Sequence, residues 1–263
     1  MTNQHCLNCN TILTNKYCSG CGQKADTHRI SFKNFVFHDL LHGTFHIEKG
    51  MLFTAREALI RPGKAALDYI AGKRKRYYNV FYLILIITGL ILFFRHFLEA
   101  NRVVVSEKTV TLNEVSIKMD DFLSQKSKLI IFLFVPFAAI NSFILFGRKK
   151  LNVSEHSIVS GMILLGILLI SLIGNLIWFI DLSFNFPERV SNTVSIFIIV
   201  AIFFYIGCGY VNAFADKYSK FEMTFRIFLF FALIFLELFL IFVIIFGFIS
   251  NWKFGQITLT PFA

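Results

Sequence analysis

The chain has 263 residues, of which 56% are hydrophobic and only 16% are charged, and its formal net charge is +10. Soluble domains carry about 25% charged residues, so this composition excludes an ordinary soluble protein. The apolar residues are clustered into long runs separated by short basic segments. This distribution indicates a membrane protein with one positively charged side.

The chain opens with a cysteine-rich segment, CLNCNTILTNKYCSGCGQ. The spacing C-x2-C-x8-C-x2-C is typical of two knuckles, each of which turns two sulfurs toward one ion. Asn10 and Gly22 follow the two knuckles and tolerate the positive φ that such turns need. We therefore predict that residues 1–27 form a small ribbon that holds one structural zinc ion. The four candidate ligands are Cys6, Cys9, Cys18 and Cys21.

Three other roles are known for cysteines in C-x-x-C pairs: disulfide formation, redox catalysis and iron–sulfur binding. A disulfide framework fits an oxidising compartment, whereas the charge distribution places this end in the reducing cytoplasm. A redox-active C-x-x-C needs a βαβ context that the segment lacks. A four-cysteine iron–sulfur site has the same ligands and stays open. Because four protein ligands leave no position for a substrate, the site is predicted to be structural. Cys208, in the fourth predicted span, is interpreted as a small buried apolar residue.

Residues 28–76 show the apolar spacing of two or three amphipathic juxtamembrane helices, which lie on the membrane surface or against the spans. The first helix is predicted to end before Gly50, and a second to start near Thr54. Pro62 interrupts the pattern and suits the first turn of a third helix that ends near Gly72.

Three histidines, His38, His42 and His46, are spaced four residues apart and share one helix face. Two histidines at this spacing can hold one metal ion, and Asp39 or His28 is a possible further ligand. The alternatives are a pH sensor and ordinary interfacial histidines that bond headgroups, water or a neighbouring helix. A second metal site is thus one of three hypotheses for this stripe.

A basic run directly precedes the first predicted span, in GKRKRYYN. We interpret it as a topogenic signal that contacts anionic lipid, and the two tyrosines after it as interfacial anchors. Nucleic acid is not an expected partner, since such a patch usually spreads over a folded face with stacking aromatics. The basic residues are Lys73, Arg74, Lys75 and Arg76.

Five apolar stretches are long enough to cross about 30 Å of hydrocarbon. Each is apolar on all faces, so a helix is the expected structure in lipid. The predicted fold is thus an all-α polytopic membrane protein whose transmembrane bundle occupies residues 77–263. The predicted spans are about 77–98, 129–147, 158–180, 193–214 and 225–249.

The Lys and Arg residues predict the orientation. Residues 1–79, the turn at 148–150 and the connection at 213–226 hold 12, 3 and 3 of the 26 basic residues, whereas the other loops and the tail hold the remaining 8. The positive-inside rule then places the N-terminus in the cytoplasm, and five spans place the C-terminus outside. The N-terminus lacks the apolar core of a secretory signal, so the first span is expected to be an uncleaved anchor.

One carboxylate lies inside an apolar span, Glu237 in FLFFALIFLELFLIFV. Such a group is costly in lipid, so it is expected to be neutral, paired or in contact with water. Asn141 and Asn175 are candidate partners from other spans. The sequence leaves open whether Glu237 has a functional role or joins helices.

The combination of C-x-x-C…YC-x-x-CGQ with FHIEKG and RPGKAALDYIAGKRKRYYN resembles a bacterial family, domain of unknown function 3667. The resemblance covers residues 6–90, and beyond them only the general hydrophobic character agrees. It implies a zinc ribbon, a juxtamembrane segment and several spans in a bacterial inner membrane, and it implies no reaction. The chain departs from the family pattern at Asn10, where Gly is common, and at Val80, where Pro is common.

Three classes of function are consistent with these features. The favoured class is a non-enzymatic scaffold or regulatory protein whose ribbon and surface helices dock a protein partner or a second copy. The second is a transporter or channel component that uses Glu237, which requires oligomerisation because five spans offer no common internal repeat. The third is a membrane-embedded enzyme with a site near His38, His42 and His46.

Overall fold

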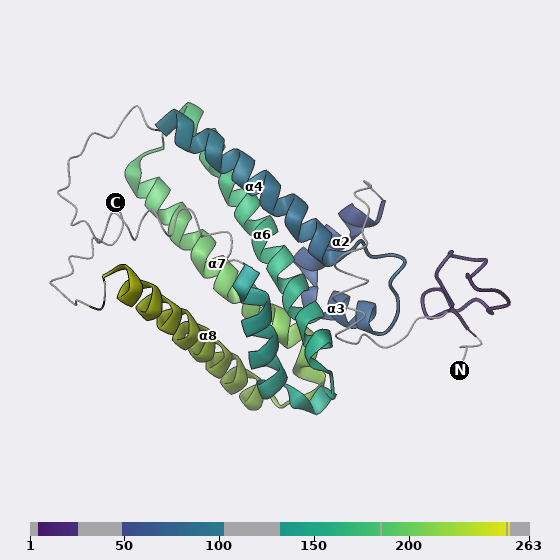
Figure 1. Ribbon diagram of the computed structural model, residues 1–263. Coiled ribbons are helices and arrows are strands. Elements are labelled where there is room, and N and C mark those ends of the chain that lie inside the picture. The colour runs from purple at the N-terminus through teal and green to yellow at the C-terminus, as the bar shows by residue number, and fades with distance from the viewer. Residues whose placement is uncertain (1–4, 26–48, 103–131, 185, 251, 253–263) are drawn as a thin grey trace.

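The computed structural model of the chain describes residues 5–25, 49–102, 132–184, 186–250 and 252. These residues form seven α-helices and no strand, which confirms the predicted all-α membrane fold. Figure 1 shows the long helices side by side. The N-terminal cysteine segment lies beyond one end of these helices, on the side of α2 and α3. The helices are α2 (Lys49–Ile60), α3 (Pro62–Ile70), α4 (Val80–Arg102), the helix Phe132–Leu145, α6 (Val153–Phe184), α7 (Glu188–Phe214) and α8 (Lys220–Ile249).

Four helices, α4, α6, α7 and α8, are long and apolar enough to cross a membrane. They correspond to four of the five predicted spans. At the remaining predicted span, 129–147, the described residues form the shorter apolar helix Phe132–Leu145. Among the described residues, four helices are therefore candidate spans by length and composition, and the fifth span stays a prediction.

Three of the four span helices begin at a polar side-chain cap, which is Asn79 for α4, Asn152 for α6 and Ser219 for α8, whereas α7 follows Pro187 and has no such cap. All four helices start at other residues than hydropathy predicts. The first helix starts at Val80 instead of 77, because Oδ1 of Asn79 accepts hydrogen bonds from the main-chain N–H groups of Phe81 and Tyr82. The three later helices start at 153, 188 and 220 instead of 158, 193 and 225. Hydropathy detects the part of a helix that suits lipid, whereas α4, α6 and α8 start where a side chain satisfies their free N–H groups, and α7 starts after Pro187.

The helices α2 and α3 form a hairpin broken at Arg61, and Pro62 occupies the first turn of α3 as predicted. The predicted start of the second helix near Thr54 is wrong, because Gly50 and Thr54 both lie inside α2. The predicted first helix falls on residues before 49, outside the described part of the chain. Gly50 permits a close approach: a Cβ there would lie 3.4 Å from the Tyr78 nitrogen. The Thr54 hydroxyl donates to the Gly50 carbonyl and accepts from the Tyr78 N–H, both at 2.8 Å.

The hairpin packs against the bundle through small residues, so the second of the two predicted placements is observed. α2 lies against α6, and α3 lies against both α6 and α7. A Cβ added to Gly63 would lie 2.4 Å from the main-chain nitrogen of Ala213 and from the carbonyl oxygen of Gly209. Only a glycine therefore allows α3 to approach the α7 backbone this closely.

Two basic turns, at residues 147–150 and 215–219, are joined to each other. The Arg148 guanidinium forms two bonds of 2.7 and 2.8 Å with the Glu222 carboxylate. The Lys149 ammonium lies 2.9 Å from Asp216 Oδ1 and donates to the Ala213 carbonyl. Because the same Ala213 contacts α3, the three basic segments predicted to share one side of the membrane lie at one end of the bundle.

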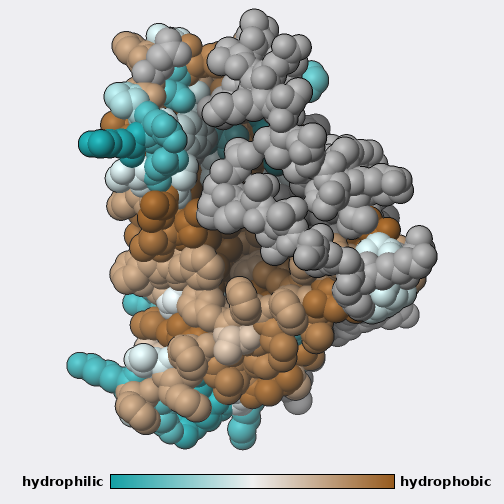
Figure 2. Space-filling view, turned by 90° about the vertical axis from the view of Figure 1, so that its left-hand side faces the viewer, coloured by the Kyte–Doolittle hydropathy of each residue, from teal (hydrophilic) through white to brown (hydrophobic). Residues whose placement is uncertain are grey.

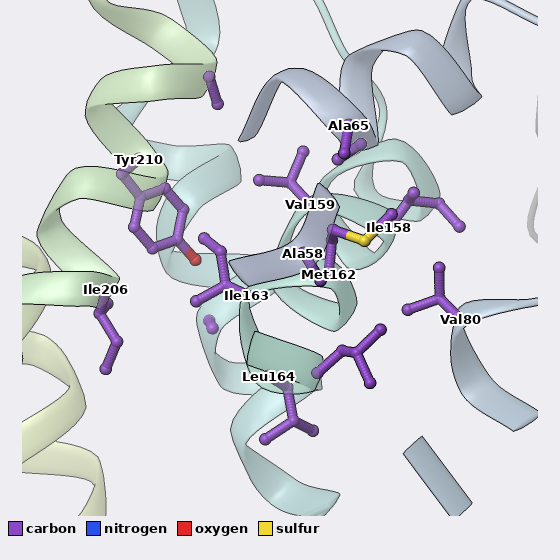
Figure 3. Packing of buried hydrophobic residues seen from close by; sticks show 14 of the residues in the cluster. Ala58, Ala65, Val80, Ile158, Val159, Met162, Ile163, Leu164, Ile206 and Tyr210 are labelled. Atoms are coloured by element: carbon purple, nitrogen blue, oxygen red, sulfur yellow. The ribbon is translucent and has the colours of Figure 1, made fainter. Parts of the chain in front are cut away.

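The hydrophobic core lies where the hairpin meets α4, α6 and α7. Figure 3 shows side chains of α6, among them Val159 and Met162, surrounded by residues of the other helices, including Ala58 and Tyr210. Ala58 and Ala65 are fully buried, and their small side chains bring the hairpin close to the spans. The core therefore fixes the hairpin as part of the bundle.

The outer surface of the bundle is apolar. Figure 2 shows a broad hydrophobic band with hydrophilic groups above and below it. Large side chains of α7 and α8, such as Phe197, Phe204 and Phe235, are more than two-thirds exposed within the protein. Such a band suits lipid contact, which agrees with the assignment of these helices as membrane spans.

Candidate metal centre and its attachment to the bundle

The cysteine segment folds as two knuckles of the same construction. In the first, the N–H of Asn10 donates to the Cys6 carbonyl, and in the second the N–H of Gly22 donates to the Cys18 carbonyl, both at 2.8 Å. Asn10 and Gly22 have φ values of 62° and 72°, as the sequence predicts. Two isolated antiparallel bridges, His5–Ile12 and Tyr17–Lys24, flank the knuckles. The main chain thus turns both cysteine pairs inward.

The four knuckle sulfurs converge on one point. All of them lie within 4.8 Å of one another, with 3.6 Å between the Cys6 and Cys21 sulfurs and 3.5 Å between those of Cys9 and Cys18. None is in a disulfide. Four sulfurs at about 2.3 Å from a tetrahedral zinc ion lie about 3.8 Å apart, so the size of the cluster fits such an ion. These residues therefore form a group that can hold a metal.

The thiols of this group differ in acidity. A hydrogen bond from the Thr11 side chain, 3.2 Å from the sulfur, lowers the pKa of Cys9 to about 6, with the Thr11 main chain adding to the effect. Burial raises the pKa of Cys21 to about 11. The Cys9 thiol is therefore more easily ionised than the Cys21 thiol, and metal binding requires both as thiolates.

Gln23, directly after the second knuckle, joins the ribbon to the basic run. Its side chain is buried, its Nε2 donates to the Gly72 carbonyl at 2.8 Å, and its Oε1 accepts from the Lys75 N–H at 3.2 Å. The Arg76 guanidinium donates to the side-chain and main-chain oxygens of Asn8 at 3.4 Å. The run GKRKR is therefore a binding surface for the ribbon, a role that the sequence analysis missed.

Gly72 is central to this contact. It has a φ of +99°, which favours glycine, and a Cβ there would lie 2.6 Å from a methyl carbon of Leu7. The side chain of Leu7 thus rests on the bare main chain of the loop. The sequence contains both the CGQ motif and the basic run, but no local pattern in it indicates that these two segments make contact.

The remaining basic residues contact α3. Lys73 Nζ donates to Asp68 Oδ1 at 2.7 Å, and the Arg74 guanidinium lies 5.5 Å from the centre of the Tyr69 ring. Tyr77 and Tyr78 are buried inside the protein, so the interpretation of both as interfacial anchors is wrong. These contacts hold the loop against the hairpin, and the predicted contact of the run with anionic lipid stays a prediction.

An ion pair at the hairpin, between the partly exposed Arg61 and the buried Glu57, was also not predicted. Arg61 lies 2.5 Å from Oε2 of Glu57 and 4.0 Å from Oδ2 of Asp68, and these carboxylates raise the pKa of the guanidinium, the hydrogen bond with Glu57 first. Burial, followed by the charges of Asp68 and Glu57, raises the pKa of Tyr77 to about 12. The network fixes the turn at Arg61 and the segment before α4.

The intramembrane carboxylate has one of its two predicted partners. Asn141 Nδ2 donates to Glu237 Oε2 at 3.0 Å, which joins the helix Phe132–Leu145 to α8. Asn175 does not reach Glu237 and donates to the Ser171 carbonyl in its own helix.

Cys208, predicted to be buried, is partly exposed on α7. The stripe of His38, His42 and His46 lies outside the described residues.

Comparison with known families confirms the resemblance over one segment. The family model described as a protein of unknown function (DUF3667) matches residues 48–93. This segment comprises α2, α3, the basic run and the first part of α4. No curated protein and no solved structure matches the chain. The matched segment is the part of the membrane domain to which Gln23 attaches the ribbon.

Proposed function

We propose that this chain is a non-enzymatic scaffold of the bacterial inner membrane whose cytoplasmic zinc ribbon docks a protein partner or a second copy of the chain. The observation that carries the proposal is the double contact of Gln23 with Gly72 and Lys75. A ribbon held at its base presents its outer face in one orientation, which lowers the entropic cost of binding a partner.

Zinc is the ion that best fits the donor set. Four thiolates in a tetrahedral arrangement are typical of structural zinc, and they leave no open position for a reacting group. When bound, the ion supplies folding free energy to a segment too short to build a hydrophobic core. The residues that would hold it are Cys6, Cys9, Cys18 and Cys21.

The cytoplasmic location follows from charge. The basic run, the turn at 147–150 and the turn at 215–219 lie at one end of the bundle, and the ribbon is attached at that end. Positively charged segments are retained in the cytoplasm during insertion. The ribbon cysteines then stay reduced, as metal binding requires.

The outer face of the ribbon carries two large exposed side chains, Ile12 and Tyr17, with 64% and 62% of their surface accessible. They lie in the two bridge pairs of the ribbon. Tyrosine and branched aliphatic side chains on a rigid support are suitable anchors for a protein interface. We assign the docking surface to these two residues.

The test is site-specific photo-crosslinking in intact cells. A photoreactive residue at position 12 or 17 is expected to give a discrete protein adduct, whose mass distinguishes a second copy from another protein. The same probe at Phe197, a lipid-facing position of α7, is the matched control and is expected to give none. Loss of the adducts in a Cys18→Ser background supports the role of the folded ribbon. Absence of any adduct at both ribbon positions would overturn the proposal.

A transport function is the second candidate, and the contact between Asn141 and Glu237 favours it, since polar groups from two helices meet in the apolar part of the bundle. The same contact serves equally well to join two helices. The enzymatic alternative depends on His38, His42 and His46, which lie outside the described residues.

A further inference from the structure

The exposed face of α2 is a stripe of three residues spaced one turn apart, Leu52, Arg56 and Ile60. Leu52 is 82% exposed and Ile60 is 63% exposed, and Arg56 between them is exposed as well. The opposite face, with Thr54 and Ala58, is fully buried. The outward face of a helix in water is usually polar. A stripe with two large aliphatic residues at its ends is therefore more suited to contact with lipid than to contact with water.

Contacts of the buried face show how deep α2 lies beside the spans. The Tyr205 hydroxyl of α7 donates to the Ala58 carbonyl, and the same hydroxyl lies against Gly166 of α6. Gly166 is thirteen residues beyond the start of α6 at Val153, or about 20 Å along the helix axis. It is about 12 Å inside the apolar stretch that begins at Ile158. The second half of α2 thus lies level with the lipid-crossing part of the bundle.

The first half of α2 lies at the edge of that region. Gly50 contacts the main chain of residues 76–78, which directly precede the first residue of α4, Val80. α2 therefore extends from the level at which α4 begins to a level inside the apolar layer. Its outward stripe crosses the boundary between lipid headgroups and acyl chains, where lipid surrounds the bundle.

Arg56 fits this boundary. It forms no ion pair with any described residue, in contrast to Arg61 one turn later, which is paired with Glu57. A long basic side chain at this depth extends toward the headgroups, and a guanidinium binds phosphate oxygens in a bidentate manner. The aliphatic residues on either side of Arg56 are then covered by acyl chains.

We propose that the stripe Leu52–Arg56–Ile60 is a lipid-binding surface, in which Leu52 and Ile60 contact acyl chains and Arg56 binds the phosphate of an anionic phospholipid. The helix that carries this stripe packs directly on the span helix α6. The hairpin is thus an interfacial element that anchors the base of the ribbon at a defined depth.

The depth is tested with single tryptophans. In a Trp178→Phe, Trp252→Phe background, Leu52→Trp and Ile60→Trp are compared in liposomes with Phe197→Trp, a lipid-facing control, and Tyr17→Trp, a control in the ribbon. Acyl-brominated phosphatidylcholine is expected to quench positions 52 and 60 at least about half as strongly as position 197, and iodide to quench only position 17. Quenching of positions 52 and 60 by iodide, or protection of both from both quenchers, would overturn the proposal.

The phosphate contact is tested by thermal unfolding in detergent with phosphatidylglycerol or phosphatidylcholine added. The unaltered protein is expected to be stabilised more by the anionic lipid, and Arg56→Gln to lose at least about half of this difference. Arg189→Gln, at the opposite end of the bundle, is the matched control and is expected to keep it. A full anionic-lipid effect in Arg56→Gln contradicts the assignment of Arg56.

Discussion

The side-chain amide of Gln23 donates to the main-chain carbonyl of Gly72, 49 positions later in the chain. This bond joins the last residue of the CGQ motif to the first residue of the basic run. Both partners are enclosed, since Gln23 is buried and Leu7 covers Gly72. The cysteine ribbon and the membrane hairpin are therefore one structural unit at this end of the protein.

Replacement of Gln23 by Ala should release the ribbon from the loop. Two hydrogen bonds, to the Gly72 carbonyl and from the Lys75 N–H, are lost at about 1 kcal/mol each. Trypsin cleavage within GKRKR should then become at least about tenfold faster, because the loop main chain opens more often. Thr14→Ala, at an exposed ribbon position, is the control. An unchanged rate in Gln23→Ala means that the contact does not hold the loop.

Metal content should follow the four cysteines. The purified protein is expected to contain about one zinc ion per chain, and Cys18→Ser to contain almost none, because one closed site needs all four thiolates. The variant should stay in the membrane fraction, since the spans insert independently of the ribbon. Elemental analysis checks the metal and fractionation the location. A metal-free wild-type protein, or iron with visible absorbance, contradicts the assignment of zinc.

Gly63→Ala should destabilise the bundle by about 1–3 kcal/mol, because its Cβ would overlap the main chain of α7 at Gly209 and Ala213. Gly89 in α4 is the matched control: nothing lies within 4 Å of a Cβ added there. Gly89→Ala should be neutral or slightly stabilising, as expected for alanine in a helix. Thermal unfolding in detergent compares the two. Equal effects of both substitutions contradict the close packing of α3 on α7.

Glu237→Gln should leave stability nearly unchanged, because a glutamine oxygen still accepts the bond from Asn141 Nδ2. Glu237→Leu should lose about 1 kcal/mol of helix association. A cysteine at position 237 in a Cys208→Ala background distinguishes a role in joining two helices from a role in transport. Protection of that cysteine from a water-soluble thiol reagent is expected for a helix-joining role, whereas rapid labelling in native membranes favours the transport candidate.

The orientation predicts the behaviour of reporter fusions. A reporter active only outside the cytoplasm should be active after Ala263 and inactive after Gly147, since the turn at 147–150 shares its end of the bundle with the ribbon base. Blue-white plate assays and enzyme activity normalised to expression measure the difference. The opposite pattern shows that the number of spans differs by one from the predicted five.

The sequence by itself determined the features that depend on local spacing and on solvent. Long apolar runs identify the four helices that are long enough to span a membrane, because lipid requires a helix wherever about 20 apolar residues follow one another. The knuckle spacing, with Asn10 and Gly22 after the cysteine pairs, predicts convergent sulfurs because each turn is closed within five residues. Pro62 likewise predicts the break in the hairpin.

Only the tertiary structure decided which of these parts touch. Nothing in the sequence distinguishes Gln23 from other polar residues. It joins the ribbon to the membrane domain only because the folded loop presents the Gly72 carbonyl and the Lys75 N–H to its side chain. Gly63 is similar, since its role depends on the backbone of α7 about 150 residues later. The sequence analysis assigned the basic run and the two tyrosines to contacts with the membrane. It could not find their contacts inside the protein, because contacts between distant segments leave no periodic pattern in the sequence. Packing places the basic run against α3 and the ribbon and buries the two tyrosines, and contact of the run with anionic lipid stays a prediction.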